Sequence, residues 1–153
     1  MGIMDGKRIS SKIKTEIFDE VQSLKKKTGK FPGLAVVLVG NDPASAIYVR
    51  NKNKTCKSVG FESFENILSP DTSEENLLSL IDKLNKDNNV NGILVQLPLP
   101  NQINSQKILE TINPKKDVDG FHLENIGRLV TGNPRFKPCT PAGIIELLDQ
   151  YNV

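Results

Sequence analysis

The sequence contains few of the residues on which metal and disulfide chemistry usually depends. Its 153 residues include two cysteines, one histidine and no tryptophan. Cys56 and Cys139 are far apart and form no C-x-x-C pair, which excludes a disulfide-rich scaffold and a cysteine-based zinc site. Because His122 is the only histidine, multi-histidine metal motifs such as H-E-x-x-H are excluded as well. We therefore expect no metal site in this chain and interpret His122 as a structural or rim residue.

Motifs that cradle phosphates or calcium are also missing. Neither G-x-G-x-x-G nor G-x-x-x-x-G-K-[ST] occurs in the sequence. The loop 40–43 is poor in glycine, and the negative charge of its Asp42 would repel a phosphate. The segment 117–120 resembles the start of a calcium loop but lacks the later ligands and the closing glutamate. The sequence therefore predicts no nucleotide-binding site within these residues.

Long apolar runs and a strong excess of one charge are absent. No stretch approaches the roughly 20 apolar residues of a membrane span, and the first ten residues contain no apolar signal core. The net charge of +2 at pH 7 argues against a strongly basic surface for nucleic acid. We therefore expect a cytoplasmic protein with reduced thiols and with neither nucleic acid nor membrane as a partner.

What the sequence does contain is an alternation of helix and strand patterns. Apolar residues at helical spacing predict a first helix that ends before Gly29, and an unbroken apolar run over 34–39 predicts a strand buried on both faces. Such alternation is typical of βαβ units, so we predict one α/β domain, a three-layer α-β-α arrangement with a mostly parallel sheet. The other predicted strands are 61–68 and 92–97, and the other helical segments are 44–59, one from Ser73, 105–112, 123–130 and one opened by Pro141, over 142–151.

Tyr48 and Lys52 are the first candidate site residues, because ligands of such sheets bind beyond the carboxyl ends of the strands. They are four residues apart, so both project from one helix face, about 6 Å apart along the axis. An aromatic face beside an ammonium group suits a flat, electron-rich ligand. The alternative is a tyrosine packed in the interior with a lysine that reaches solvent.

Gln96 and Asp119 are the second and third candidates. The Gln96 amide ends an otherwise apolar strand and requires hydrogen-bond partners, either a ligand or catalytic side chain or a neighbouring loop. Asp117 and Asp119 form an acidic pair on a loop that ends in Gly120, and such a pair could aim a carboxylate at adjacent ring N–H groups in a cleft. The alternative for this pair is a plain solvated turn.

Four segments carry a family resemblance, and they cover essentially the whole chain. They are Val39-Gly40 with Ala44-Ser45-x-x-Tyr48-Val49-x-x-Lys52-x-Lys54, then Gly92–Pro100, Pro114–Phe121 and Pro138–Gly143. In this order they resemble the bifunctional methylenetetrahydrofolate dehydrogenase/methenyltetrahydrofolate cyclohydrolase family, called FolD in bacteria. The most specific parts are Val-Gln-Leu-Pro-Leu-Pro and Lys-Asp-Val-Asp-Gly.

The resemblance implies a role for each candidate residue. Lys52 matches the family's catalytic lysine, and Tyr48 matches the ring that stacks on the aminobenzoyl group of the folate. Gln96 matches the glutamine that contacts and tunes the lysine, and Asp119 matches the carboxylate that grips the pterin. The resemblance further implies that Val95, Leu97 and Pro98 contact the substrate and that Ser45 supports the site with a hydrogen bond.

The resemblance also implies a reaction and a missing half. The family oxidises 5,10-methylenetetrahydrofolate with NADP and hydrolyses the methenyl product to 10-formyltetrahydrofolate. Its chains are roughly twice as long and continue into a Rossmann-type domain. We therefore expect residues 1–153 to be the folate-binding catalytic domain, with a final helix at about 141–153 leading toward an absent NADP-binding domain, and we expect this chain alone to oxidise nothing.

Two further expectations concern assembly and the competing interpretations. The whole protein is implied to be a homodimer whose contact lies mainly in the other half, which leaves the present chain free to be a monomer. The alternative function is a non-catalytic module that binds a folate or a pterin. A substrate domain of a different two-domain dehydrogenase is the other alternative, but it would not be expected to carry the two most specific segments together.

Overall fold

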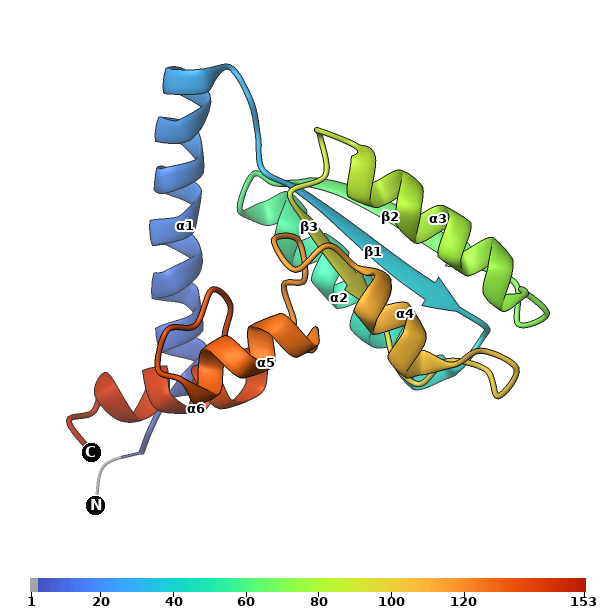
Figure 1. Ribbon diagram of the computed structural model, residues 1–153. Coiled ribbons are helices and arrows are strands. Elements are labelled where there is room, and N and C mark those ends of the chain that lie inside the picture. Colours follow the sequence, from blue (N-terminus) through green and yellow to red (C-terminus); the bar gives the residue numbers. More distant parts are fainter. Residues whose placement is uncertain (1–2) are drawn as a thin grey trace.

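The computed structural model describes residues 3–153 and contains a parallel sheet between two layers of helices (Figure 1). The central strand β1 (Gly33–Val39) pairs with β2 (Glu62–Leu68) on one side and with β3 (Gly92–Val95) on the other. Both pairings are parallel, with Val37 opposite Asn66 and Val95. The predicted α/β class and its parallel sheet are confirmed.

β1 is buried on both faces, as its unbroken apolar run predicts. Successive side chains of a strand point to opposite faces, so alternate residues enter different cores. Ala35, Val37 and Val39 belong to one apolar cluster, whereas Val36 and Leu38 belong to the other. This central strand therefore supports both helical layers and fixes where its carboxyl end meets them.

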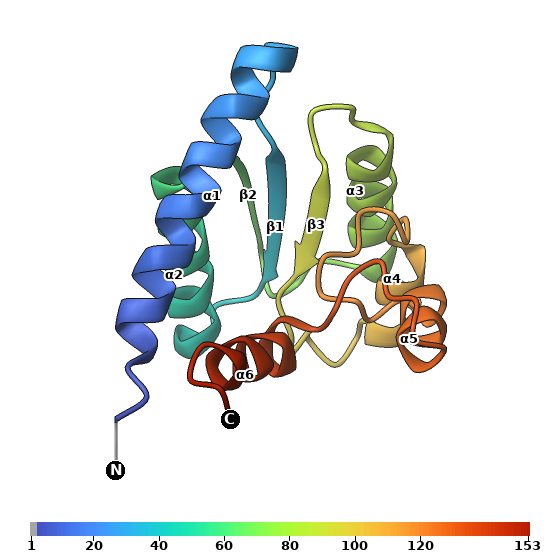
Figure 2. The same ribbon diagram turned by 90° about the vertical axis from the view of Figure 1, so that its left-hand side faces the viewer.

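The two layers use different helices (Figure 2). On one face α2 (Pro43–Ser58) packs Val49 against the β1 residues Val36 and Leu38. On the other face lie α3 (Glu74–Lys86) and α4 (Ser105–Thr111), which contribute Leu77, Ile81 and Ile108 to the larger cluster. The three-layer arrangement follows directly from these two apolar contacts.

The first and last helices meet at one end of the molecule. The helix α1 (Gly6–Thr28) begins at the cap Asp5 and ends at Gly29, whose φ of 74° is readily adopted only by glycine. The Tyr151 hydroxyl, just after α6 (Cys139–Asp149), accepts a hydrogen bond of 2.7 Å from the Asp5 backbone N–H. The two ends of the described chain are therefore held together (Figure 1).

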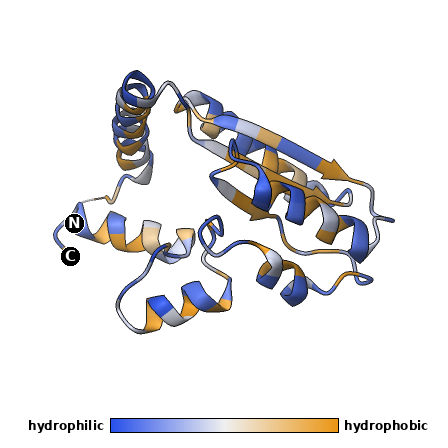
Figure 3. Cartoon of the chain, turned by 45° about the horizontal axis from the view of Figure 1, so that its top comes forward, coloured by the Kyte–Doolittle hydropathy of each residue, from blue (hydrophilic) through white to orange (hydrophobic). Residues whose placement is uncertain are grey.

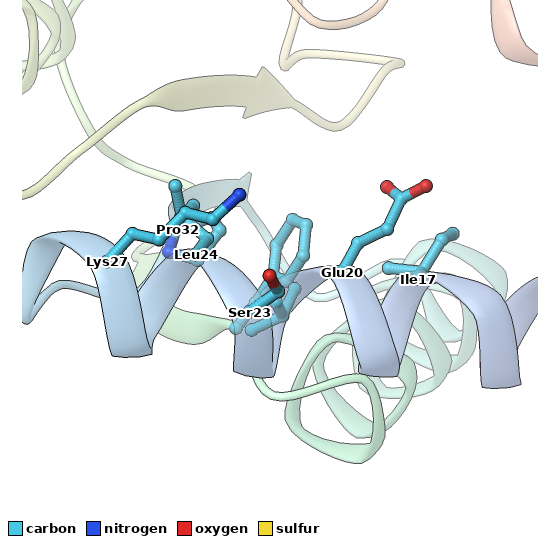
Figure 4. Close-up of a pocket in the computed structure, with 8 residues that line it drawn as sticks. Ile17, Glu20, Ser23, Leu24, Lys27 and Pro32 are labelled. Atoms are coloured by element: carbon cyan, nitrogen blue, oxygen red, sulfur yellow. The ribbon is translucent and has the colours of Figure 1, made fainter.

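A groove of about 560 Å³ runs along α1, because this helix buries only Ile9 and Val21 against the rest of the chain. Ser23, Lys27 and Glu20 supply polar groups at its border (Figure 4). Its apolar lining comes from Ile17, Val21, Leu24, Pro32 and Phe61.

Two helices late in the chain leave apolar side chains exposed. Hydrophobic and hydrophilic residues are interspersed along both helices (Figure 3). The helix α5 (Leu123–Val130) buries only Asn125, and α6 buries no residue. The exposed apolar residues on these helices are Leu123, Ile126, Leu129, Val130, Ile144 and Ile145.

The structure corrects two predicted boundaries. β3 ends at Val95 rather than at residue 97, although the Gln96 N–H still donates to the Val37 carbonyl at 2.9 Å. The last helix begins at Cys139, two residues before Pro141, and ends at Asp149. A proline is tolerated at the third helical position because the first N–H groups of a helix have no intrahelical partner. No helix within residues 3–153 is long and apolar enough to cross a membrane.

Candidate active site

Lys52 and Gln96 meet at the carboxyl edge of the sheet. The Lys52 side chain on α2 is half-buried, and its Nζ donates a hydrogen bond of 3.0 Å to Gln96 Oε1. Gln96 directly follows β3, so this bond connects a helix on one face of the sheet with the end of an edge strand. Both partners considered for the Gln96 amide are present: Lys52, a catalytic candidate, and the Leu97 carbonyl of the loop that follows β3.

The Gln96 amide is held in one orientation. Its Nε2 donates to the Leu97 carbonyl at 2.7 Å, which leaves Oε1 to accept from the lysine. The opposite orientation would place the amide oxygen against a carbonyl oxygen and the amide N–H₂ against a donor. Gln96 therefore orients the Lys52 amine without contributing a charge that would hold it as an ammonium ion.

Asp119 is the third member of this cluster. Burial raises the pKa of the Asp119 carboxyl, while the positive charge of Lys52 opposes the rise and the negative charge of Asp117 adds to it. A carboxyl group in this position takes up a proton more readily than an exposed aspartate does. The charge of Lys52 acts on Asp119, so this carboxyl lies in the neighbourhood of the hydrogen-bonded Lys52 and Gln96.

Cys139 lies beside the same charges, and sequence reasoning did not include it in the site. Burial raises the pKa of the Cys139 thiol, the Asp119 charge raises it further, and the Lys52 charge lowers it. The Sγ atom is 3.9 Å from the Val118 carbonyl oxygen. The raised pKa keeps the sulfur as a thiol, so it is not an activated nucleophile. Only its place in the Pro138–Gly143 motif hinted at a role.

Tyr48 precedes Lys52 by one turn of α2, and its side chain is exposed, with a fractional exposure of 62%. The alternative of an interior tyrosine beside a solvated lysine is therefore wrong, because the lysine is the more buried of the two. An exposed ring next to a hydrogen-bonded amine leaves a flat apolar face open to a ligand.

The remaining predicted site residues have structural contacts. Ser45 is buried and its N–H donates to Asp42 Oδ2 at 2.7 Å, where the backbone and hydroxyl of Ser45 lower the pKa of the Asp42 carboxyl. The Val95 side chain lies in the core and Leu97 packs against it, whereas Pro98 is exposed. Substrate contacts of these residues stay predictions, and for Val95 they would involve the backbone.

The acidic pair predicted from the sequence is divided by the fold. Asp119 lies within the electrostatic influence of Lys52, but Asp117 is 1% exposed and points into the protein, where it accepts a hydrogen bond of 2.8 Å from the His122 N–H. His122 caps α5, and its Nδ1 accepts from the Glu124 N–H at 3.1 Å. The interpretation of His122 as a structural residue is confirmed.

The helix starts after β1 and β2 are not suited to the phosphates of a dinucleotide. The helix after β1 starts at Asp42, whose carboxylate already occupies the end of that helix. The helix after β2 is capped by Ser73 and carries Glu74 and Glu75 in its first turn. Both helix starts therefore repel a phosphate rather than attract one, and no hydride step is assigned to residues 3–153.

The fold and this cluster define the class of the protein, a three-layer α/β domain with a lysine-centred polar site at the carboxyl edge of its sheet. The chain belongs to the tetrahydrofolate dehydrogenase/cyclohydrolase family, since the model of that family's catalytic domain matches residues 4–119. The family resemblance inferred from the sequence segments is confirmed.

Named relatives and solved structures agree with this assignment. Bifunctional protein FolD of Geotalea daltonii is 58% identical and that of Acetivibrio thermocellus 53% identical, each over 151 residues, or 99% of this chain. The crystal structure of FolD from Campylobacter jejuni has a TM-score of 0.96 at 48% identity and covers 99% of this chain. A Trypanosoma brucei enzyme, solved in complex with NADP cofactor and inhibitor, has a TM-score of 0.95 at 34% identity, with 99% of this chain and 52% of that chain covered.

The chain spans about half the length of these proteins. It covers 53% of the Acetivibrio relative, 54% of the Geotalea relative and 54% of the Campylobacter structure.

Proposed function

We propose that this chain forms the folate-binding catalytic part of a bifunctional enzyme. That enzyme would oxidise 5,10-methylenetetrahydrofolate with NADP to 5,10-methenyltetrahydrofolate and hydrolyse this product to 10-formyltetrahydrofolate. The observation that carries the proposal is the hydrogen bond of 3.0 Å between Lys52 Nζ and Gln96 Oε1, with the Asp119 carboxyl close enough to couple to the lysine.

Hydrolysis needs a group that takes a proton from the attacking water. Lys52 is our candidate for this base, because its amine lies at the edge of the sheet and is oriented by an uncharged amide. A free lysine is protonated at neutral pH, so a base catalyst of this type is favoured when its direct hydrogen-bond partner adds no negative charge. Gln96 meets that requirement, since it holds the amine through a neutral oxygen.

Binding of the folate would use the other groups at this edge. Asp119 can accept two parallel N–H bonds from a pterin ring, and Tyr48 can stack on the aminobenzoyl ring. The exposure of Tyr48 and the half-buried position of Asp119 support these roles. We assign the remaining predicted contacts to Val95, Leu97 and Pro98 along the strand end, with Ser45 in support.

NADP would accept the hydride, and its site belongs to the part of the relatives that this chain does not cover. Support comes from the Trypanosoma brucei enzyme, which was solved with NADP and which this chain covers over 52% of its length. We further propose that the whole protein is a cytoplasmic homodimer whose subunit contact lies mainly in that other part.

A chimera tests the catalytic assignment. In it this chain replaces the matching part of the Acetivibrio thermocellus relative, and hydrolysis of methenyltetrahydrofolate is followed by the loss of its absorbance. We expect Lys52→Met to abolish hydrolysis while circular dichroism and the Tm stay unchanged. Lys57→Met, on an exposed residue of the same helix outside the family motif, is the matched control and should keep its activity. Unchanged turnover in Lys52→Met would refute Lys52 as the base.

The second candidate function is binding of a folate or pterin without turnover. It is favoured by one observation, that the helix starts after β1 and β2 do not fit a dinucleotide phosphate while the Lys52 cluster is present. Isothermal titration of tetrahydrofolate into the 153-residue chain, together with the hydrolysis assay of the chimera, separates binding from turnover. We expect the chain alone to reduce no NADP, and measurable reduction would contradict this expectation.

A further inference from the structure

Asp117 is a buried carboxylate at the root of the loop that carries Asp119. Asp117 is 1% exposed and forms an isolated parallel β-bridge with Ile93 of β3. The loop is tied there by a hydrogen bond of 2.7 Å from the Ile93 N–H to the Lys116 carbonyl. The chain therefore runs beside β3 at Asp117 and reaches Asp119 two residues later, at the edge where Gln96 lies.

Asn125 holds the Asp117 carboxylate. Asn125 is fully buried, and its Nδ2 donates to Asp117 Oδ2 at 2.8 Å and to the Pro114 carbonyl at 2.9 Å. Both partners are acceptors, so the amide must point its N–H₂ group toward them. Asp117 Oδ2 also accepts from the His122 N–H at 2.8 Å. These bonds join the loop, its preceding turn and the start of α5.

A purely structural role does not explain this arrangement. Within residues 3–153 no lysine or arginine forms an ion pair with Asp117, and Asn125 Oδ1 is buried without a hydrogen-bond partner. A buried carboxyl without a cation beside it and a half-satisfied amide are less favourable for folding than two well-packed apolar side chains. This polar pair lies at the root of the loop, with Asp117 two residues before the site residue Asp119.

We propose that Asp117, held by Asn125, is a positioning residue that fixes Asp119 for binding of the pterin ring. The inference rests on the proposed function for the identity of the ligand. Asp117 acts in two ways. Its hydrogen bonds set the path of the loop, and its negative charge changes the protonation of Asp119.

The electrostatic effect has a definite direction. The charged and titratable groups coupled to Asp119 are Lys52 on α2, Asp117 on the same loop and Cys139 on α6. Asp117 raises the pKa of the Asp119 carboxyl, so removal of its charge should lower that pKa. The titration midpoint of the Asp119 carboxyl should therefore move to lower pH when the Asp117 charge is removed.

Two substitutions separate the two effects. Asp117→Asn has the same shape and can keep its side-chain oxygen at the position that accepts from His122 and Asn125, so it removes mainly the charge. Asn125→Ala removes the bonds to Asp117 and Pro114 and frees the loop. Ile81→Ala is the stability control, because this buried residue of α3 belongs to the core cluster on the face opposite α2.

The ligand for the binding test is tetrahydrofolate, titrated into the 153-residue chain. We expect Asn125→Ala to weaken binding on the order of tenfold or more, as a misplaced contact group does. Ile81→Ala should lower the Tm at least as much but change the affinity less than about twofold, since distant sites act independently. If Asn125→Ala and Ile81→Ala both lose affinity for tetrahydrofolate in proportion to their loss of Tm, the proposal is overturned.

A second readout needs no ligand. NMR titration of the Asp119 side-chain carboxyl in the free chain should give a lower midpoint in Asp117→Asn than in the parent, and an unchanged midpoint would overturn the electrostatic part. Hydrogen exchange of the His122 amide, which donates to the Asp117 carboxyl, should speed up in Asn125→Ala but not in Ile81→Ala. If tetrahydrofolate does not bind the parent chain, the proposed function fails, while these two measurements still decide the positioning role.

Discussion

Lys52 and Gln96 contact each other across the edge of the sheet, and their hydrogen bond of 3.0 Å has a fixed polarity. The Gln96 amide nitrogen is occupied by the Leu97 carbonyl, so only the amide oxygen can face the lysine. Because a neutral oxygen accepts from either protonation state of the amine, the contact survives whether the lysine is charged or neutral. The chemistry of the site depends on this neutrality.

Gln96→Glu should therefore suppress hydrolysis without unfolding the chain. The new carboxylate would lie against the Lys52 amine and favour its ammonium form, which cannot act as a base. We expect turnover of methenyltetrahydrofolate in the chimera to fall by a factor on the order of 10² to 10⁴, the usual contribution of general base catalysis. Gln102→Glu makes the same change on an exposed glutamine outside the site and should keep full activity. Equal turnover in both variants would contradict the role of Gln96.

Asp119 should make the folded chain less stable as the pH rises. Its pKa is raised by burial, so the folded state binds the proton more tightly than the unfolded state does. The destabilisation is absent below the unfolded pKa of about 3.9 and becomes complete once the pH exceeds the raised folded pKa. We expect Asp119→Asn to have a higher Tm than the parent at pH 7, with the difference vanishing near pH 3, and to bind tetrahydrofolate more weakly. A Tm of Asp119→Asn below that of the parent chain at pH 7 would contradict this expectation.

Glu74 should behave in the opposite way, which makes it a useful counterpart. The Lys107 ammonium and the Asn104 N–H hold the pKa of the Glu74 carboxyl below its usual range, at distances of 2.6 and 2.8 Å. A carboxyl with a lowered folded pKa stabilises above the unfolded value of about 4.3 and loses this effect as the pH falls through the folded value. Glu74→Gln should therefore lower the Tm at pH 7 but not at strongly acidic pH. Thermal unfolding of Glu74→Gln and of the parent chain at neutral and strongly acidic pH measures this difference in Tm.

Cys139 should report on occupancy of the site through its reactivity. Burial and the Asp119 charge raise the pKa of its thiol, so alkylation by iodoacetamide should keep accelerating above pH 8.5, the pKa of a free cysteine. Bound tetrahydrofolate should slow the reaction, because the thiol lies beside Asp119. Mass spectrometry of a Cys56→Ser variant isolates the signal of Cys139. An unaltered alkylation rate at saturating tetrahydrofolate would place the ligand elsewhere.

Much of the fold was predictable because burial on two faces leaves a clear pattern in the sequence. The run over 34–39, bounded by Gly33 and Gly40, favours a strand covered on both faces, and the apolar spacing before Gly29 favours an amphipathic helix. The boundaries at Val95 and Cys139 were not predictable in the same way. A proline is compatible with more than one position in the first turn of a helix, so Pro141 did not fix where α6 begins.

The site was predictable in part. Helix spacing places Tyr48 and Lys52 on one face, but only the fold shows which of the two is buried. Asp117 and Asp119 look equivalent in the sequence, and the difference between an internal and a site carboxylate depends on the path of the loop beside β3. The approach of Cys139 to this loop depends on the chain returning from a distant segment, for which a single sequence contains no signal.

The exposed ring of Tyr48 has a practical consequence for spectroscopy. The chain contains no tryptophan and only two tyrosines, the second being Tyr151 at the junction between the first and last helices. In a Tyr151→Phe background, tyrosine emission would come from a single ring, one helical turn from the Lys52 amine. Quenching of that emission would then follow the arrival of a flat ligand in real time, with no dye attached.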